Sequence, residues 1–216
     1  KESSAASDVY KRQGHDMKRI ITIGREFGSG GREVGRRLAE RLNIAYYDRE
    51  IIDELMKRTQ LAESYVLQVE ESRPLPLLPI TTARTFGIPT NYTLENRLSI
   101  YKQESEIIRE MAEKSDCIIV GRCANDILKS RPTSRSIFIH APLDYRLQTV
   151  MERTSLEEKE ALSLIKKVDK QRKFYYNYYT DKKWEEMSQY DLCLDSSAMS
   201  EDEILNVLTA LYESIL

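Results

Sequence analysis

The sequence predicts an α/β protein whose parallel sheet is covered by helices on both faces. Two observations predict this fold class: short strand-like runs alternate with helical patterns, and the runs are apolar throughout instead of alternating with polar residues. A continuously apolar strand is typical of a sheet that is buried on both sides. Strands that alternate with helices favour parallel pairing, because each helix carries the chain back to the same edge of the sheet.

Five short runs rich in β-branched residues predict the strands. They lie at residues 19–23, 44–47, 117–120, 136–140 and 191–194. In sheets of this kind, ligands bind beyond the carboxyl ends of the strands. The loops that follow these runs therefore form the expected rim of a binding site.

Apolar residues at helical spacing follow the predicted strands. The helical patterns lie at about residues 34–42, 51–56, 94–114, 143–153, 157–179 and 200–214. Residues 1–16 are polar and without periodicity, so we expect a disordered tail or cloning remnant ahead of a single domain at 17–216. Four prolines within 72–92 predict a loop or irregular insert.

Composition excludes several classes of protein. The chain has 216 residues, of which 41% are hydrophobic and 31% charged, as in ordinary globular proteins. Its net charge of −2 argues against a nucleic-acid coat or a polybasic membrane anchor, and no apolar run reaches the roughly 18 residues of a membrane helix. Three cysteines are interpreted as reduced thiols of a cytoplasmic protein, and two histidines exclude a His-rich metal site. We expect small molecules as partners, and the oligomeric state stays open.

Residues 24–31, Gly-Arg-Glu-Phe-Gly-Ser-Gly-Gly, give the strongest functional signal. Glycines let successive backbone N–H groups converge, and the following helix N-terminus adds positive potential, so we expect a phosphate here. A tight strand-to-helix turn without a ligand is the alternative. The loop is not a Walker A motif, because Gly31 and Arg32 follow Gly30 where that motif has Lys and Ser/Thr. Arg25 and Arg32 are the local cations that can substitute, unless they are solvated surface charges.

Four parts of the chain together resemble the cytidylate kinase-like family, relatives of the nucleoside monophosphate kinases. They correspond to the first strand with its phosphate loop, the second strand, the third strand with its arginine, and the lid helix with the base-side loop. These parts are residues 21–35, 44–49, 118–122, and 168–172 with 190–197.

The resemblance covers about residues 17–214. It implies a three-layer P-loop kinase fold, with a five-stranded parallel sheet, helices on both faces and a helical lid at about 154–186. It places the 72–92 insert on the acceptor side. It implies phosphoryl transfer from ATP, with Mg²⁺, to a nucleoside monophosphate (CMP-like) or a similar small acceptor.

The resemblance also implies roles for single residues. Arg122 holds the acceptor phosphate, unless it is only a salt-bridge partner at the edge of the sheet. Arg172 clamps the transferring phosphoryl group and Asp169 orients it. Arg25, a cation within the loop itself, is the remaining catalytic candidate. Asp169 and Arg172 are three residues apart, so they share a helix face and can pair. The cofactor-binding candidates are Phe27, Gly28, Ser29, Gly30, Gly31, Arg32, Glu33, Ser196 and Ser197. The acceptor-binding candidates are Asp48, Arg97, Arg109 and Arg122.

Some of these roles have alternatives. Asp48 contacts the acceptor side or assists the metal, or it is a plain helix N-cap. Arg97 and Arg109 are twelve residues apart on one predicted helix, within about 120° of each other around its axis. A solvated face is the expected place of at least one of them.

The chain departs from the family pattern where a metal would bind. Val120 and Gly121 stand where an Asp commonly ends the third strand, and Cys123 stands where cytidylate kinases tend to carry Asp. The metal ligand therefore stays unknown, with three acidic candidates. These are Glu26, Glu33 and Asp126.

Two hypotheses about function remain. The first is an active ATP-dependent kinase, and the second is a nucleotide- or phosphate-binding sensor of the same fold that has lost transfer. Surviving transfer requires a compensating set of arginines that converge on one anion. That set is Arg25, Arg32, Arg122 and Arg172.

Overall fold

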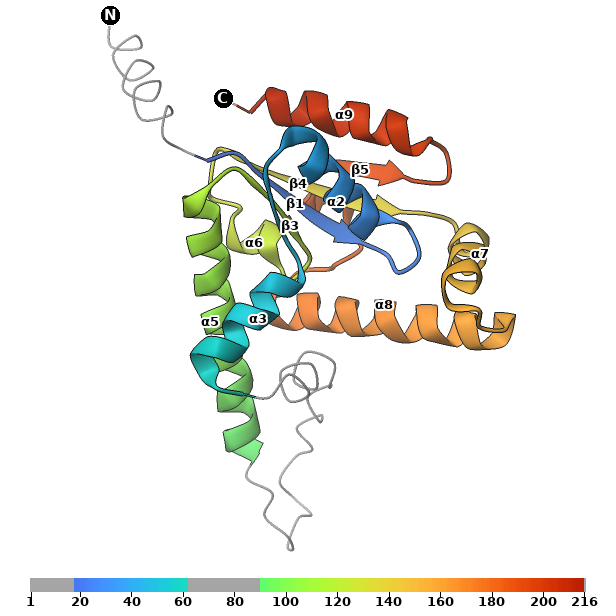
Figure 1. Cartoon of the computed structure of the whole chain (residues 1–216). Coiled ribbons are helices and arrows are strands. Elements are labelled where there is room, and N and C mark those ends of the chain that lie inside the picture. The colour runs from blue at the N-terminus through green and yellow to red at the C-terminus, as the bar shows by residue number, and fades with distance from the viewer. Residues whose placement is uncertain (1–17, 62–89, 216) are drawn as a thin grey trace, which may run out of the picture.

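The computed structural model describes residues 18–61 and 90–215; the predicted tail and most of the predicted 72–92 insert lie outside these ranges. Within them, five strands form one parallel sheet in the order β2-β3-β1-β4-β5 (Figure 1). This confirms the predicted parallel sheet. The strands are β1 (Ile20–Arg25), β2 (Ala45–Tyr47), β3 (Cys117–Val120), β4 (Ser134–His140) and β5 (Leu192–Asp195).

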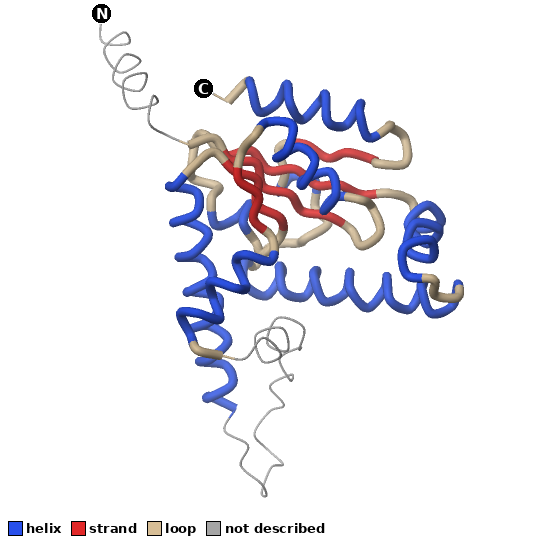
Figure 2. Tube along the Cα trace, in the orientation of Figure 1, coloured by secondary structure: helices blue, strands red, loops and turns tan. Residues whose placement is uncertain are grey.

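Helices cover both faces of this sheet, as Figure 2 shows. The side chains of Ile21 and Ile23 lie in one core with α2 (Gly31–Leu42) and α9 (Glu201–Glu213). Alternate residues of the same strands, such as Ile20, lie in a second core with α3, α5 and α6 on the opposite face. These three helices span Arg49–Thr59, Thr90–Lys114 and Ala124–Ile127. The three-layer arrangement thus follows from the period of two along each buried strand.

The two remaining helices, α7 (Leu143–Thr154) and α8 (Glu158–Thr180), pack on each other through an apolar cluster that includes Val150 and Ile165. From α7, α8 runs beneath the sheet toward α5 (Figure 1). Its second half joins a cluster of aromatic residues at the sheet, where Tyr176 is buried with Phe138 and Trp184. This packing holds α8 near the carboxyl ends of β1 and β3. Of the described helices, none is long and apolar enough to cross a membrane.

The boundaries differ from the sequence prediction at a few places. The helix predicted from about residue 94 begins at Thr90, so residues 90–92 are helical and not part of a loop. Helix α6 and the 3₁₀ turn η1 (Met187–Gln189) were not predicted. They contain 4 and 3 residues, which is too short for a periodic apolar pattern.

The start of α9 offers a test of its local stability. Ser200 accepts a hydrogen bond from the Glu203 N–H, and the Glu203 carboxylate accepts one from the Ser200 N–H, which forms a capping box. Ser200→Ala should lower the free energy of unfolding by about 1 kcal/mol. We expect a melting temperature lower by roughly 2–4 °C for a chain of this size, measured by circular dichroism.

Glu213→Gln is the matched control, because Glu213 is exposed in the last turn of the same helix. It should change the melting temperature much less. An equal decrease in both variants would contradict the role of the capping box.

Candidate functional site

The glycine loop joins β1 to α2, as the sequence predicted, but β1 continues to Arg25 and α2 begins at Gly31, so the loop is shorter than the predicted 24–31. Gly28 and Gly30 have φ angles of 84° and 80°, in the left-handed region that favours glycine. A Cβ at Gly28 would also lie 2.9 Å from the carbonyl oxygen of Arg146. Gly30 is the N-cap of α2, and in the described structure no side chain caps it. A carboxylate that capped the first N–H groups of α2 would exclude an anion from them. In the part of the chain that the structure describes, these N–H groups carry no such cap and can therefore bind one.

A cavity of about 390 Å³ lies over the loop and gathers arginines from several elements. Two carboxylates, Glu26 and Asp48, also line it. So many guanidinium groups around one cavity create the positive potential and the forked donors that suit a phosphate. The lining arginines are Arg25, Arg32, Arg49, Arg122, Arg153 and Arg172. All four arginines whose convergence the sequence analysis required are among them.

Arg25 is held between two glycines. A Cβ on Gly31 would lie 2.6 Å from the Cβ of Arg25, and a Cβ on Gly121 would overlap the Arg25 guanidinium group. The Nε of Arg25 is buried and has no hydrogen-bond partner among the described residues. A buried unpaired N–H is costly, and a phosphate oxygen would satisfy it. Arg25 thus fills the space beside Gly31, the position where a Walker A loop carries its lysine.

The arginines perturb one another. Burial, together with the nearby Arg25, lowers the pKa of Arg172 to about 9. Burial also lowers the pKa of Arg25; Asp48 opposes this shift and Arg122 adds to it. In contrast, Asp48 raises the pKa of Arg32, whose Nε lies 2.5 Å from the Asp48 carboxylate. A bound anion would relieve the repulsion between the buried guanidinium groups.

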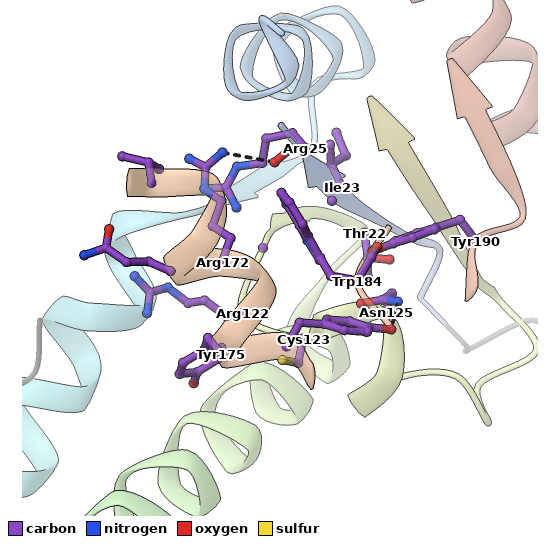
Figure 3. Close-up of a pocket in the computed structure, with 15 residues that line it drawn as sticks. Thr22, Ile23, Arg25, Arg122, Cys123, Asn125, Arg172, Tyr175, Trp184 and Tyr190 are labelled. Atoms are coloured by element: carbon purple, nitrogen blue, oxygen red, sulfur yellow. Dashed lines mark hydrogen bonds between the residues drawn. The ribbon is translucent and has the colours of Figure 1, made fainter. Parts of the chain in front are cut away.

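Helix α8 contacts the loop at two points. Arg172 donates from Nη1 to the carbonyl oxygen of Arg25 at 3.0 Å, which Figure 3 shows as a dashed line. Asp169 accepts from the Phe27 N–H at 2.7 Å and from Nη1 of Arg146 at 2.6 Å. In the described structure these two side chains make no direct hydrogen bond or ion pair with each other, because each bonds to the loop or to Arg146. Asp169 still lies close enough to Arg172 for its charge to oppose the lowering of the Arg172 pKa.

Two of the predicted cofactor-binding serines stabilise the loop. Ser29 is buried and donates to the carbonyl oxygens of Glu26 and Ile139. Ser196 donates to the carbonyl oxygen of Ser29 at 2.7 Å, which ties the turn after β5 to the loop. Ser197 is exposed at this turn, and its N–H and hydroxyl both donate to Asp195.

Three other predicted residues lie apart from the loop cavity. Glu33 accepts hydrogen bonds from Arg36 and Arg37 along α2, and these bonds lower the pKa of Glu33 to about 2. Arg109 is exposed on α5. Arg97 is buried on the same helix, where its carbonyl oxygen accepts from the Tyr179 hydroxyl.

The metal candidates have basic partners. Glu26 accepts from the Ala141 N–H and lies 3.3 Å from Nε of Arg146, and Asp126 accepts from Nζ of Lys182 at 2.6 Å. The described part of the chain holds no group of three or more His, Cys, Asp or Glu side chains suited to a metal. Mg²⁺ needs only one or two protein carboxylates when phosphates supply other ligands. Glu26 and Asp48 fit that requirement because both line the loop cavity.

A second cavity, of about 200 Å³, lies between the ends of β1 and β3 and helix α8. It shares Arg25, Arg122 and Arg172 with the loop cavity. Its remaining wall, drawn in Figure 3, includes four aromatic residues and Asn125, whose amide donates to the Tyr176 hydroxyl at 2.9 Å. The aromatic residues are Tyr175, Tyr176, Trp184 and Tyr190.

Sequence reasoning missed two buried charged residues beside these cavities. Arg146 donates to the carbonyl oxygens of Ala141 and Phe27 and to Asp169, so it joins α7 to the loop and α8. Glu104 pairs with Arg122. The signal for Glu104 was present, since a charged residue stands within the apolar stripe of α5. That stripe is Ile100, Ile107, Ile108 and Met111.

Comparisons with known proteins place the chain in a family. The family model described as "Cytidylate kinase-like family" matches residues 20–198. A cytidylate kinase of Methanopyrus kandleri is 28% identical over 206 residues, which cover 91% of this chain and 94% of that protein. An uncharacterized protein from Eubacterium ventriosum has a crystal structure with a TM-score of 0.69 at 33% identity, over 91% of this chain and 99% of that one.

The likeness to a shikimate kinase from Bacteroides thetaiotaomicron concerns the fold alone. Its TM-score is 0.52 at 15% identity, over 90% of this chain and 98% of that one. The family model, by contrast, matches more than half of the residues of this chain. With the five-stranded parallel sheet and the glycine loop that this structure shows, the chain belongs to the cytidylate kinase-like family.

Proposed function

We propose that this protein transfers the γ-phosphoryl group of ATP to a nucleoside monophosphate, with CMP as the first acceptor to test. One observation carries the proposal: four arginines from four different segments line a single cavity over the glycine loop. Membership of a kinase-like family and the cytidylate kinase relative support it. The four residues are Arg25, Arg32, Arg122 and Arg172.

Phosphoryl transfer depends mainly on in-line positioning and on neutralising oxygens of both substrates. The N–H groups at the start of α2 and the Arg25 guanidinium would hold the ATP phosphates. Arg122 would hold the acceptor phosphate, since it lines both cavities. Arg172 lines both cavities and donates to the carbonyl oxygen of Arg25, so it would neutralise the group that passes between the substrates.

Mg²⁺ bound with ATP would supply further positive charge at the phosphate oxygens. Glu26 and Asp48 are the carboxylates of the loop cavity that would hold it. The acceptor base would enter the smaller cavity, where Tyr175, Tyr176 and Trp184 offer faces for a planar ring.

A phosphate- or nucleotide-binding sensor is the second candidate. The observation that favours it is that each carboxylate suited to Mg²⁺ already has a basic partner. Asp48 pairs with Arg32, and Glu26 lies beside Arg146. Such pairing competes with a metal ion for the same oxygens.

The decisive experiment is a coupled assay with ATP, Mg²⁺ and a panel of monophosphates. We expect ADP release that depends on the acceptor, with CMP among the active compounds. ATP binding without a phosphorylated product from any acceptor would contradict the kinase and favour the sensor.

Alanine substitutions should separate the two substrates. Arg122→Ala removes a charge-assisted phosphate contact of about 1.5–3 kcal/mol, so kcat/KM for the acceptor should fall roughly 10- to 150-fold. Arg25→Ala should instead raise KM for ATP by a similar factor. Steady-state kinetics with each substrate varied in turn measures both effects.

Arg135→Ala is the control for these variants, because Arg135 lies near the amino end of β4, away from the loop. It should leave both parameters within about twofold of the wild-type values, because Arg135 lines neither of the two cavities. An unchanged kcat/KM after Arg122→Ala would remove Arg122 from the site.

The contact between Arg25 and Gly31 gives a further prediction. Gly31→Lys restores a Walker-type lysine but forces its Cβ onto the Arg25 side chain, so ATP affinity should fall and not rise. The double variant Arg25→Gly/Gly31→Lys removes the overlap and should bind ATP at least about tenfold more tightly than Gly31→Lys alone, the loss expected from one ionic contact. Calorimetric titration with a non-hydrolysable ATP analogue measures this. Wild-type affinity in Gly31→Lys would show that Arg25 does not occupy the lysine's place.

A further inference from the structure

Glu104 is a fully buried carboxylate that the proposed reaction does not use. Its side chain has 0% exposed surface, and one carboxylate oxygen accepts from Nη1 of Arg122 at 2.7 Å. The other oxygen accepts from the Tyr175 hydroxyl. The three residues come from α5, from the turn after β3 and from α8, so the carboxylate joins three separate elements.

Stability is a weak explanation for this carboxylate. Its neighbours along α5, Ile100, Ile107 and Ile108, are buried and apolar, so an apolar side chain would suit the same stripe. Burying a charge is costly unless it is paired and hydrogen-bonded, and apolar replacements of buried ion pairs are often neutral or stabilising. Orientation of Arg122 is the role that the pair can perform and an apolar residue cannot.

The backbone around Arg122 supports the same interpretation. Gly121, Arg122 and Cys123 have φ angles of 78°, 55° and 55°, so two consecutive non-glycine residues are left-handed. This conformation is unfavourable for such residues and persists only where the surroundings hold it. The Gly121 N–H donates to the Ile23 carbonyl oxygen at 2.9 Å, and the Ala124 N–H donates to the Gly121 carbonyl oxygen at 3.1 Å. The turn carries Arg122 to the border of both cavities, between Arg172 and Tyr175 in the view of Figure 3.

We propose that Glu104 is a positioning residue for Arg122. Its carboxylate holds the guanidinium group through Nη1 and so fixes the orientation in which Arg122 meets the acceptor phosphate; the Tyr175 hydroxyl fixes the carboxylate from α8. Tyr175 lies three residues after Arg172 on α8, and Arg172 bonds the glycine loop. The same helix therefore supports both the orientation of Arg122, through Glu104, and the contact with the loop. This inference rests on the proposed function for the role of Arg122.

A double-mutant cycle tests it. Glu104→Gln keeps the size of the side chain and one oxygen acceptor but removes the charge. We expect kcat/KM for CMP to fall about tenfold and the affinity for inorganic phosphate to weaken, while KM for ATP stays unchanged. In the Arg122→Ala background, the same change should have no further effect, because a residue that acts through Arg122 has nothing left to position.

Two further variants make the test specific. Glu106→Gln, at an exposed position of the same helix, should behave as wild type. Tyr175→Phe keeps the ring and removes one hydrogen bond to Glu104. It should lower kcat/KM for CMP and weaken the affinity for inorganic phosphate, each by a smaller factor than Glu104→Gln. If Glu104→Gln does not fold, an unchanged kcat/KM in Tyr175→Phe overturns the proposal.

Additive losses in the double variant would also overturn it, since Glu104 would then act independently of Arg122. Tighter phosphate binding by Glu104→Gln would show that the carboxylate competes with the phosphate and does not position the arginine. If the wild type phosphorylates no acceptor while the phosphate-binding cycle still shows the coupling, the proposed function fails and the role of Glu104 stands.

Discussion

The repulsion between guanidinium groups gathered at the carboxyl ends of β1 and β3 is the constraint on which the rest of the site depends. Arg25 lies between Gly31 and Gly121, where any Cβ would displace it, and its Nε is buried without a partner in the described chain. Arg172 approaches so closely that burial and this neighbour lower its pKa to about 9. Asp48 and Glu104 offset part of this repulsion, since they pair with Arg32 and Arg122. A phosphate at the glycine loop would offset more of it and would satisfy the Nε of Arg25.

The order of the strands brings this cluster together. Because β3 pairs directly with β1, Gly121 and Arg122 lie beside the end of β1 although about a hundred residues separate them in the chain. Helix α8 completes the arrangement by bonding the loop through Asp169 and Arg172. Three segments that are distant in sequence thus line one cavity over the glycine loop, and the proposed function assigns to its arginines the role of the usual lysine.

Most of the fold was predictable because its strands are buried on both sides and its longer helices are amphipathic. The glycine loop, Arg25, Arg32 and Arg122 were also visible in the sequence, since glycine spacing and strand ends are local signals. Arg172 lies within a helix, and only the family resemblance pointed to it. What was missed depends on packing. Asp169 of α8 pairs with Arg146 of α7, and Glu104 of α5 pairs with Arg122 in the turn after β3. Each pair joins two separate elements, so residue spacing along one helix could not predict it. Glu33 turns toward Arg36 and Arg37 because α2 presents it on its outer side.

The most direct measurement of the central claim is a crystal structure of the protein with a non-hydrolysable ATP analogue. The account predicts that a phosphate oxygen lies within hydrogen-bond distance of the Arg25 guanidinium group and of the first N–H groups of α2, with Arg172 on the same phosphates. Phosphates bound elsewhere, with the Arg25 Nε still buried and unpaired, would contradict the claim that arginine replaces lysine in this loop.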